Sequence, residues 1–244
     1  MRNAMSTHNF DSRLVSFTSP ASFAAEQYQG LRLTIERLGH RGPAQIIAVS
    51  SAAAGEGKTV TAINLAGALA RGSEARVLLV DADLRRPAIG KTLGLLDPHV
   101  NGLADVVVDP RLDFPAVARH IEPYSLWVVP AGDPRAQIHR VLRSPRLEQL
   151  LQSARQQFDY IVIDTPPLLP VFDSALLSRI VDGLLVVVAA NQTPRKLLGE
   201  ALNLVDPGKV LGIVFNRDDR PLFGYYDEYY REYFPETSGA VTGA

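Results

Sequence analysis

The sequence predicts an α/β fold, a doubly wound and mostly parallel sheet flanked by helices. Apolar runs such as VLLV and YIVI alternate along the chain with segments of helical periodicity. The runs are continuously apolar, which is typical of parallel strands buried on both faces. With 244 residues, of which 46% are hydrophobic, the chain is long enough to bury one large core. Strands joined by helices form right-handed crossovers, and ligands of such sheets bind at the carboxyl ends of the strands.

The predicted elements begin after a polar, irregular stretch over residues 1–20, which indicates a flexible leader. Residues 22–38 repeat apolar side chains every three or four positions, which predicts a helix with one apolar face. Further strands are predicted at 45–50, 76–80, 126–130, 160–164, 183–190 and 210–215, and further helices at 59–72, 145–158, 174–181 and 194–205. Residues 84–125 have the least regular pattern. We expect one domain over 21–216 and a tail over 217–244.

Composition excludes several classes of function. The formal net charge of −1 gives no electrostatic reason to expect a nucleic acid as partner. The chain has no cysteine, which excludes disulfides, thiolate metal sites, iron–sulfur clusters and a cysteine nucleophile. The start shows no signal peptide, and the longest apolar runs are shorter than the roughly 20 residues that span a bilayer. We therefore expect a cytoplasmic protein.

The stretch after the first predicted strand is a candidate phosphate-binding loop. Residues 52–59 read AAAGEGKT, which matches the P-loop pattern except that Ala52 replaces its first glycine. Such a loop directs backbone N–H groups and a helix N-terminus toward a phosphate chain. Lys58 would reach the β- and γ-phosphates of ATP, and Thr59 would ligate Mg²⁺. The residues expected to bind the nucleotide here are Ala54, Gly55, Glu56, Gly57, Lys58, Thr59 and Val60. The alternative is a glycine-rich turn with an incidental lysine.

Three aspartates follow two other predicted strands. Asp81 and Asp83 come after RVLLV, and Asp164 ends YIVID. The carboxyl ends of parallel strands meet at one sheet edge, so these carboxylates should gather beside the loop. Asp81 and Asp164 suit the task of holding the water ligands of Mg²⁺, and Asp83 is placed to face the attacking group. Each of them, taken singly, could also simply cap the next helix.

The segments GEGKT, VLLVDADLRRP and DYIVIDTPP, in this order, resemble the Walker A, Walker A′ and Walker B motifs of the bacterial tyrosine kinases (BY-kinases). The resemblance runs from about Glu26 to the end of the chain. It implies a P-loop NTPase of the deviant Walker type and an ATP- and Mg²⁺-dependent protein-tyrosine autokinase of capsule or exopolysaccharide synthesis or export. The implied catalytic residues are Lys58, Asp81, Asp83 and Asp164, with Thr59, Asp81 and Asp164 serving the metal.

Related classes of P-loop protein fit less well. Partition and septum-positioning ATPases carry a signature lysine at the position of Ala53, and the nitrogenase-iron-protein relatives need cysteines. Ala54 stands where the kinases commonly have proline. Two rival functions remain: an ATPase switch or scaffold of the partition superfamily without tyrosine transfer, and a small-molecule kinase, for which no acceptor pocket is recognisable.

The tail concentrates the tyrosines of the chain. Tyr225, Tyr226, Tyr229, Tyr230 and Tyr233 alternate with charged residues. An aromatic helix packed on the core is one interpretation. The resemblance implies the other, in which these tyrosines accept phosphate from the kinase. The length of the tail allows transfer within one subunit or to a neighbour, and the resemblance favours the neighbour.

The resemblance also implies an assembly and a partner. The helix over 21–39 has Glu26, Gln29 and Arg32 where the family has Glu-x-x-Arg-x-x-Arg, a ring-forming motif, although a solvated helical face would look similar. A glutamine cannot form the bidentate ion pair of an arginine. Asn216, at the end of the last strand, matches the adenine-reading position. Because the chain shows no membrane span, we expect a separate membrane-anchored polysaccharide co-polymerase to activate it and to recruit it to the inner face of the membrane.

Overall fold

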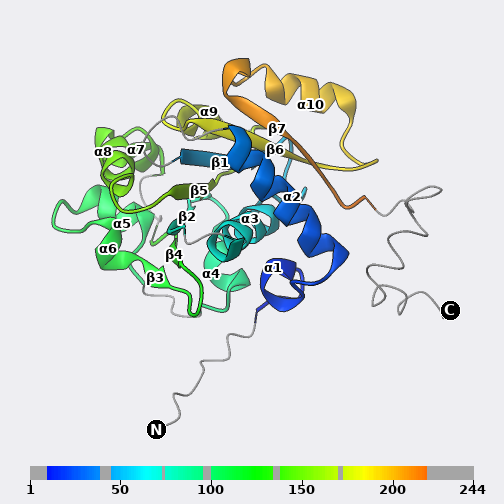
Figure 1. Cartoon of the computed structure of the whole chain (residues 1–244). Coiled ribbons are helices and arrows are strands. Elements are labelled where there is room, and N and C mark those ends of the chain that lie inside the picture. Colours follow the sequence, from blue (N-terminus) through cyan, green and yellow to red (C-terminus); the bar gives the residue numbers. More distant parts are fainter. Residues whose placement is uncertain are drawn as a thin grey trace, which may run out of the picture.

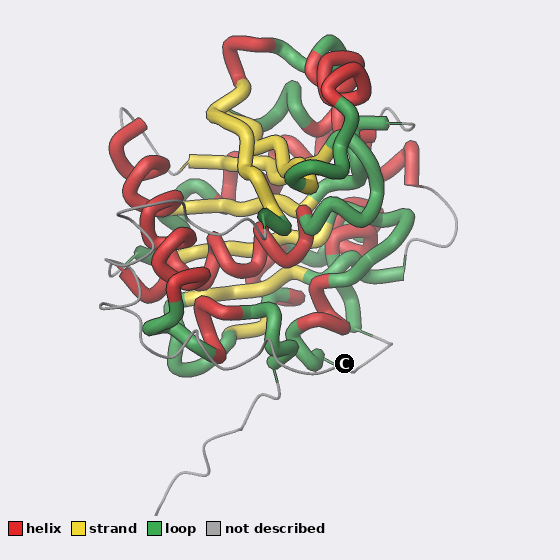
Figure 2. The backbone as a smooth tube through the Cα atoms, turned by 90° about the vertical axis from the view of Figure 1, so that its right-hand side faces the viewer, coloured by secondary structure: helices red, strands yellow, loops and turns green. Residues whose placement is uncertain are grey.

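A seven-stranded sheet forms the centre of the computed structural model, and helices cover both of its faces (Figures 1 and 2). The structure describes residues 10–38, 45–72, 75–95, 100–133, 138–169 and 173–218. The strands are β1 (Gln45–Ser51), β2 (Val77–Asp81), β3 (Arg119–His120), β4 (Leu126–Val129), β5 (Tyr160–Asp164), β6 (Gly183–Ala189) and β7 (Val210–Asn216). They lie in the order β3-β4-β2-β5-β1-β6-β7, and only β3 runs antiparallel to its neighbour. The predicted fold class is confirmed.

The helices that connect the strands include all those predicted, with shorter bounds in some cases. They are α1 (Val15–Thr18), α2 (Phe23–Leu38), α3 (Lys58–Gly72), α4 (Ile89–Thr92), α5 (Leu103–Val108), α6 (Phe114–Val117), α7 (Ile138–Leu142), α8 (Pro145–Ala154), α9 (Asp173–Leu177) and α10 (Arg195–Leu202), with a 3₁₀ turn at Pro207–Lys209. Among the described residues, no helix has the length and hydropathy needed to cross a membrane.

Successive residues of each central strand belong to two different hydrophobic layers. In β1, Ile46 and Ala48 pack with α5 to α10, whereas Ile47 and Val49 pack with α1 to α4. The side chains of a strand alternate between the two faces of a sheet, so both layers need apolar residues. This explains the continuous apolar runs in the sequence. The polar residues at the carboxyl ends of the strands are consequently the part of the sheet that is available for chemistry.

The region of least regular sequence folds into several short elements. Between β2 and β4 the chain forms α4, α5, α6 and the two-residue strand β3. None of these helices is longer than six residues. Two turns are too few to show a helical period, so the sequence pattern did not reveal them.

The N-terminal segment differs from the flexible leader that we expected. Leu14 is completely buried and Phe17 is 8% exposed, and both belong to the hydrophobic layer around α3. Ser16 donates hydrogen bonds from its backbone nitrogen and hydroxyl to Asn64, each at 2.9 Å. Residues 10–18 are therefore an integral part of the domain. The burial depends on a partner helix far along the sequence, which a local pattern does not show.

Candidate active site

The loop between β1 and α3 makes the sharp turn that its sequence predicts. Gly55 has φ 84° and Gly57 has φ 98°, in the left-handed region that favours glycine. A Cβ atom at Gly57 would also lie 1.9 Å from Asn216 Nδ2, whereas a Cβ at Gly55 would meet nothing within 4 Å. Gly57 is thus required both by its backbone conformation and by its neighbour. The turn leads directly into α3, whose N-terminus presents backbone N–H groups to the site.

The side chain of Glu56 stabilises the loop by hydrogen bonds and does not line the cavity. This side chain is buried, and Oε2 accepts a hydrogen bond from the backbone nitrogen of Ala53 at 2.8 Å. Oε1 accepts a hydrogen bond from the hydroxyl of Thr193, which follows β6. Asn216, at the end of β7, donates from Nδ2 to the carbonyl oxygen of Glu56 at 2.8 Å. These contacts show Glu56 and Asn216 as supports of the loop, and the predicted contact between Asn216 and adenine stays a prediction.

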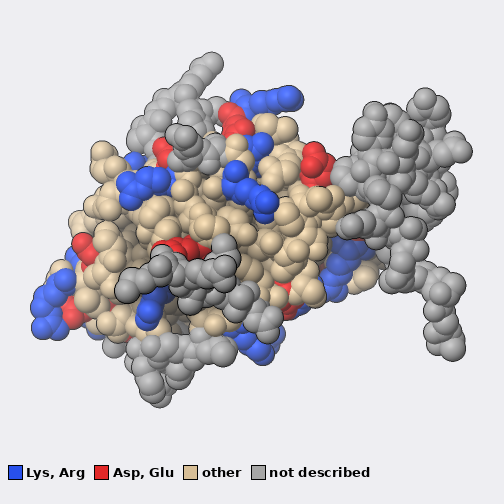
Figure 3. All heavy atoms as spheres, turned by 60° about the horizontal axis from the view of Figure 1, so that its bottom comes forward, with Lys and Arg blue, Asp and Glu red and all other residues tan. Residues whose placement is uncertain are grey.

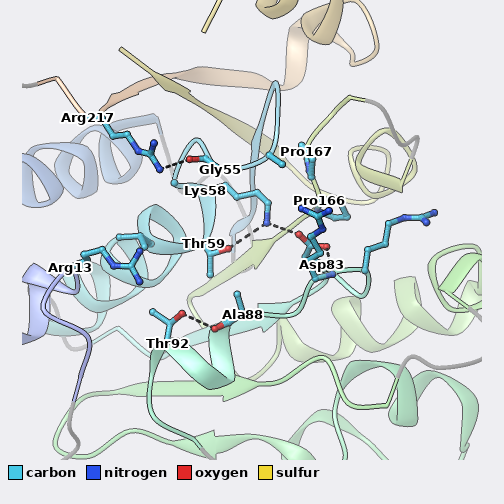
Figure 4. Close-up of a pocket in the computed structure, with 15 residues that line it drawn as sticks. Arg13, Gly55, Lys58, Thr59, Asp83, Ala88, Thr92, Pro166, Pro167 and Arg217 are labelled. Atoms are coloured by element: carbon cyan, nitrogen blue, oxygen red, sulfur yellow. Dashed lines mark hydrogen bonds and ion pairs between the residues drawn. The ribbon is translucent and has the colours of Figure 1, made fainter. Parts of the chain in front are cut away.

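Lys58 and Asp83, two of the predicted catalytic residues, point toward each other in the cavity, with Thr59 beside them (Figure 4). Lys58 Nζ lies 2.7 Å from Asp83 Oδ2 and 3.5 Å from Asp164 Oδ1. The Thr59 hydroxyl donates to Asp164 Oδ2 at 2.6 Å. The convergence of the loop with the aspartates of two other strands is confirmed. Their individual roles in catalysis stay predictions.

Asp81 and Asp164 are direct neighbours in the sheet, at the ends of β2 and β5. Asp81 Oδ2 accepts hydrogen bonds from the backbone nitrogens of Ala88 and Ile89, both at 3.0 Å, and Oδ1 accepts one from Asp83 at 3.2 Å. The Asp81 carboxylate therefore organises the loop that carries Asp83. Its predicted task of holding the water ligands of Mg²⁺ stays a prediction.

Burial and mutual repulsion shift the titration of these groups. Burial, followed by the charge of Asp164, raises the pKa of Asp81 to about 7. Burial, opposed by Lys58 and Thr59, raises the pKa of Asp164 to about 6. Burial acts to lower the pKa of Lys58, but the carboxylates of Asp164 and Asp83 outweigh it and raise that pKa above its ordinary value. Lys58 is therefore held in its cationic form, while burial disfavours ionisation of Asp81 and Asp164.

Lys58, Thr59 and Asp83 line a cavity of about 490 Å³. Its described lining contains five basic side chains and one acidic side chain, namely Arg13, Lys58, Arg85, Arg86, Arg217 and Asp83. Elsewhere, on the face shown in Figure 3, described charges of both signs are scattered over the surface. The concentration of positive charge in one cavity indicates an anionic ligand with several charges, such as a triphosphate.

The donor set fits a magnesium ion that arrives with phosphates. Within the described residues, no three His, Cys, Asp or Glu side chains are grouped as a metal site. Nucleotide-bound Mg²⁺ takes only one or two protein ligands, and waters and phosphates complete its shell. Asp164 Oδ1 is buried without a hydrogen bond, although Lys58 lies nearby, and the Thr59 hydroxyl is adjacent. Thr59 and Asp164 are thus the groups that would serve the metal.

Four arginines of this cavity are not among the site residues predicted from the sequence. Arg85 and Arg86 directly follow Asp83 in the second motif, and Arg217 directly follows Asn216. Because these three arginines follow predicted site residues closely, their positions in the sequence already indicate that they lie near the site. Arg85 also pairs with Asp173, which is buried at the start of α9, at 2.5 Å. Arg13 carries no such signal, because it lies in the stretch over residues 1–20 for which the sequence predicts a flexible leader.

The predicted assembly residues lie on α2. Glu26 is exposed and Gln29 is half-buried. Arg32 is turned toward its own domain, where Nη1 lies 3.3 Å from Glu36 Oε1. A Cβ at Gly72 would be 2.1 Å from Arg32 Nη1, so the guanidinium packs on the end of α3. The ring motif stays a prediction, and the tail tyrosines at 225–233 lie outside the described residues.

Known proteins resemble this chain over most of its length. A family profile described as "AAA domain" matches residues 44–206. The succinoglycan biosynthesis transport protein ExoP of Rhizobium meliloti is 33% identical over 217 residues, which are 86% of this chain but only 27% of that protein. The tyrosine-protein kinase YwqD of Bacillus subtilis is 31% identical over 218 residues, which cover 87% of this chain and 90% of that protein.

A solved structure gives the same fold. The kinase domain of the Escherichia coli tyrosine kinase ETK superposes with a TM-score of 0.79, covering 92% of this chain and 88% of that one. At 24% identity this likeness concerns the fold alone. The sequence relatives show the family as well as the fold, because the match to YwqD spans nearly the whole of both chains. The chain belongs to the bacterial tyrosine kinases, whose P-loop domain it comprises.

Proposed function

We propose that this kinase domain transfers phosphate from ATP to the tyrosines of its own C-terminal segment, and that it does so between subunits. The acceptors are the five tail tyrosines predicted from the sequence, Tyr225, Tyr226, Tyr229, Tyr230 and Tyr233. The observation that carries the proposal is the cluster of Lys58, Thr59 and Asp83 in the wall of the basic cavity, with Asp164 buried in contact with Lys58 and Thr59.

The residues of the site have separable tasks. ATP·Mg²⁺, when bound, supplies the phosphoryl group and two positive charges that offset the charge on its oxygens. Lys58 stabilises the charge of the transferred group, for which it must turn from Asp83 toward the phosphates. Asp83 accepts the proton of the tyrosine hydroxyl as the oxygen–phosphorus bond forms and the bond to the departing ADP breaks. Thr59 and Asp164 orient the metal.

The course of the chain supports a tail acceptor. Arg217, directly after β7, lines the cavity and donates from Nη2 to the carbonyl oxygen of Gly55 at 2.5 Å. The main chain therefore leaves the last strand beside the P-loop. Tyr225 follows Arg217 by eight residues (225 minus 217), which span at most about 28 Å when extended. This length reaches either the site of the same subunit or that of an adjacent one.

We further propose a cycle of assembly that regulates exopolysaccharide or capsule synthesis or export. Each phosphate adds a charge of about −1.5 to −2 at neutral pH. Asp227, Glu228 and Glu232 already lie among the tyrosines, so phosphorylation should repel the tail from any docked position and loosen a ring. The membrane-anchored co-polymerase expected from the family would activate the domain at the membrane. The relative ExoP is named a succinoglycan biosynthesis transport protein, and this name supports a role in exopolysaccharide synthesis or export.

The test is mass spectrometry of peptides from 217–244 after incubation with ATP·Mg²⁺. We expect phosphotyrosine in the wild type and none in Lys58→Met. For transfer between subunits, an active chain with all five tail tyrosines changed to phenylalanine is mixed with Lys58→Met. Phosphate on the Lys58→Met tail supports transfer in trans. A bare tail together with ATP hydrolysis, even with the membrane partner added, would instead favour the ATPase switch.

A further inference from the structure

The segment before α2 brings an arginine into the wall of the nucleotide cavity. Arg13 lines the cavity together with Thr59, Val60 and Thr92 (Figure 4). Its side chain is 66% exposed, so the guanidinium itself is not held there by burial. It belongs to none of the phosphate-binding or aspartate motifs. Its place in the site therefore calls for a role of its own.

A buried asparagine ties Arg13 to the helix of the phosphate loop. Asn64 is fully buried on α3 and donates from Nδ2 to the carbonyl oxygen of Arg13 at 3.0 Å. Ser16 donates two further hydrogen bonds to Asn64, to Oδ1 and to the carbonyl oxygen. Because α3 begins at Lys58, the backbone at Arg13 has a fixed position relative to the loop.

Apolar packing holds the same segment on its other side. Leu14 is completely buried, and the ring of Phe17 lies against Gly67, where a Cβ would approach the ring to 2.5 Å. The Phe17 ring also makes an edge contact with Tyr124 at a centroid distance of 5.0 Å. Only a glycine on α3 permits this close approach. The position of the Arg13 backbone is thus determined by tertiary contacts of the residues around it.

The guanidinium of Arg13 is oriented by a short-range partner. Arg13 Nε and Nη2 donate to the two carboxylate oxygens of Asp11 at 2.8 and 2.6 Å. These bonds hold the pKa of Asp11 below its usual range. They engage one edge of the guanidinium, and the described residues offer no acceptor to the N–H groups on Nη1. A planar, pre-oriented group with unused donors is well suited to phosphate or ribose oxygens.

We propose that Arg13 binds the nucleotide at the end remote from the transferred phosphate. This inference rests on the proposed function, in which ATP·Mg²⁺ occupies the cavity. Lys58 Nζ is directed toward Asp83, which marks the end for the terminal phosphate. Figure 4 shows Arg13 and Arg217 on the opposite side of the loop. The matching ligand chemistry is the part shared by ADP and ATP, the α-phosphate and the ribose.

The chain contains a matched control for this arginine. Arg111 donates to Asp109, two residues before it, from Nε at 2.9 Å and from Nη2 at 2.6 Å. It therefore reproduces the local geometry of Arg13 with Asp11. Arg111 is 87% exposed and does not line the cavity. The same substitution at the two arginines separates a role in the site from the loss of a surface ion pair.

The experiment is calorimetric titration of the full chain with Mg²⁺ and either ADP or a non-hydrolysable ATP analogue. We expect Arg13→Ala to weaken both ligands about tenfold, the effect of one lost charge-assisted contact. Arg111→Ala should bind as the wild type does. Arg13→Lys should recover part of the affinity, because it restores the charge without the planar donors. Thermal melting in the absence of nucleotide checks that every variant folds.

A change at Asp11 distinguishes a direct contact from a structural one. Asp11→Ala removes the ion pair but keeps the cation, so its affinity should stay within about twofold of the wild type. An equal loss in Asp11→Ala and Arg13→Ala would overturn the proposal in favour of a structural role of the pair.

The remaining outcomes separate this inference from the proposed function. Unchanged affinity in Arg13→Ala, with binding lost in Lys58→Met, would overturn only the role of Arg13. A loss confined to the ATP analogue would overturn its placement at the nucleoside end. A wild type that binds neither ligand would overturn the proposed function as well.

Discussion

The two ends of the nucleotide cavity are built in different ways. At one end, Lys58 lies between Asp83 and Asp164, with its side chain 10% exposed and the carboxylates buried almost completely. At the other end, Arg13 and Arg217 come from opposite ends of the described chain and are exposed. The buried end consists of residues at the end of β5 and in the loops that follow β1 and β2, whereas the open end depends on how remote segments dock.

The two ends are expected to govern different properties: the buried end governs phosphoryl transfer, and the open end contributes to nucleotide affinity. Charges at the buried end interact through a medium of low dielectric constant, so each of them has a large effect and shifts the pKa of its neighbours. Charges at the open end are screened by water and salt, so each contributes modestly. We therefore expect substitutions at the buried end to abolish phosphoryl transfer and those at the open end to weaken nucleotide binding by small factors.

The largest effect is expected for Lys58→Met. Loss of the cation removes charge stabilisation from the transferred phosphoryl group, and tail phosphorylation should fall about a thousandfold. The carboxylates of Asp83 and Asp164 also lose their counter-charge, which should destabilise the nucleotide-free domain by about 3 kcal/mol. Timed mass spectrometry of the tail and denaturant unfolding measure the two effects. Retention of more than a tenth of the activity would place the critical charge elsewhere.

The next effect concerns the turn that connects the two ends. Gly57→Ala combines a strained backbone with a clash against Asn216 and should destabilise the domain by about 3 kcal/mol. Gly55→Ala meets only the strain and should destabilise it by about 1 kcal/mol. Chemical denaturation compares the two variants. If the clash is the cause, adding Asn216→Ala to Gly57→Ala restores part of the lost stability, and a double variant no better than the single one would contradict this.

The pH dependence of stability tests the buried carboxylates. The pKa of Asp164 is raised to about 6 from its ordinary value of 3.8. Between these values the folded protein keeps a proton that the unfolded chain releases, so ionisation lowers stability as the pH rises through this window. Asp164→Asn cannot ionise and should gain about 3 kcal/mol relative to the wild type from about pH 4 to about pH 7. A constant difference between the two unfolding curves would contradict the raised pKa.

The smallest effect is expected for Arg217→Ala at the open end. The substitution removes an exposed hydrogen bond to Gly55 and one charge of the cavity, so ADP affinity should fall about threefold. The loss should shrink in high salt, because an exposed charge is screened. Calorimetric titration at two salt concentrations, with Arg111→Ala as the control, provides the measurement. A loss that does not depend on salt would mean that Arg217 supports the loop rather than attracts the ligand.

Much of the buried end could be predicted from the sequence. The strands around it are apolar runs, and the motif residues follow them at once, so the parallel sheet brings Lys58, Asp83 and Asp164 together. The direction of a side chain was harder to predict. Glu56 lies within the P-loop motif, yet it points away from the cavity to Thr193. Arg32, which belongs to the predicted ring motif, contacts Glu36 and the end of α3 in its own subunit, a contact that the sequence did not reveal.

The sequence by itself determined the fold class, the phosphate loop and the edge of the sheet where chemistry occurs, because these follow from short-range patterns and from the rule that parallel strands end together. The tertiary structure decided the open end of the cavity. Arg13 reaches the site because Asn64, Leu14 and Phe17 form buried contacts between segments that are distant along the chain. Such contacts depend on the packing of α3 against its neighbours, and no local periodicity encodes them.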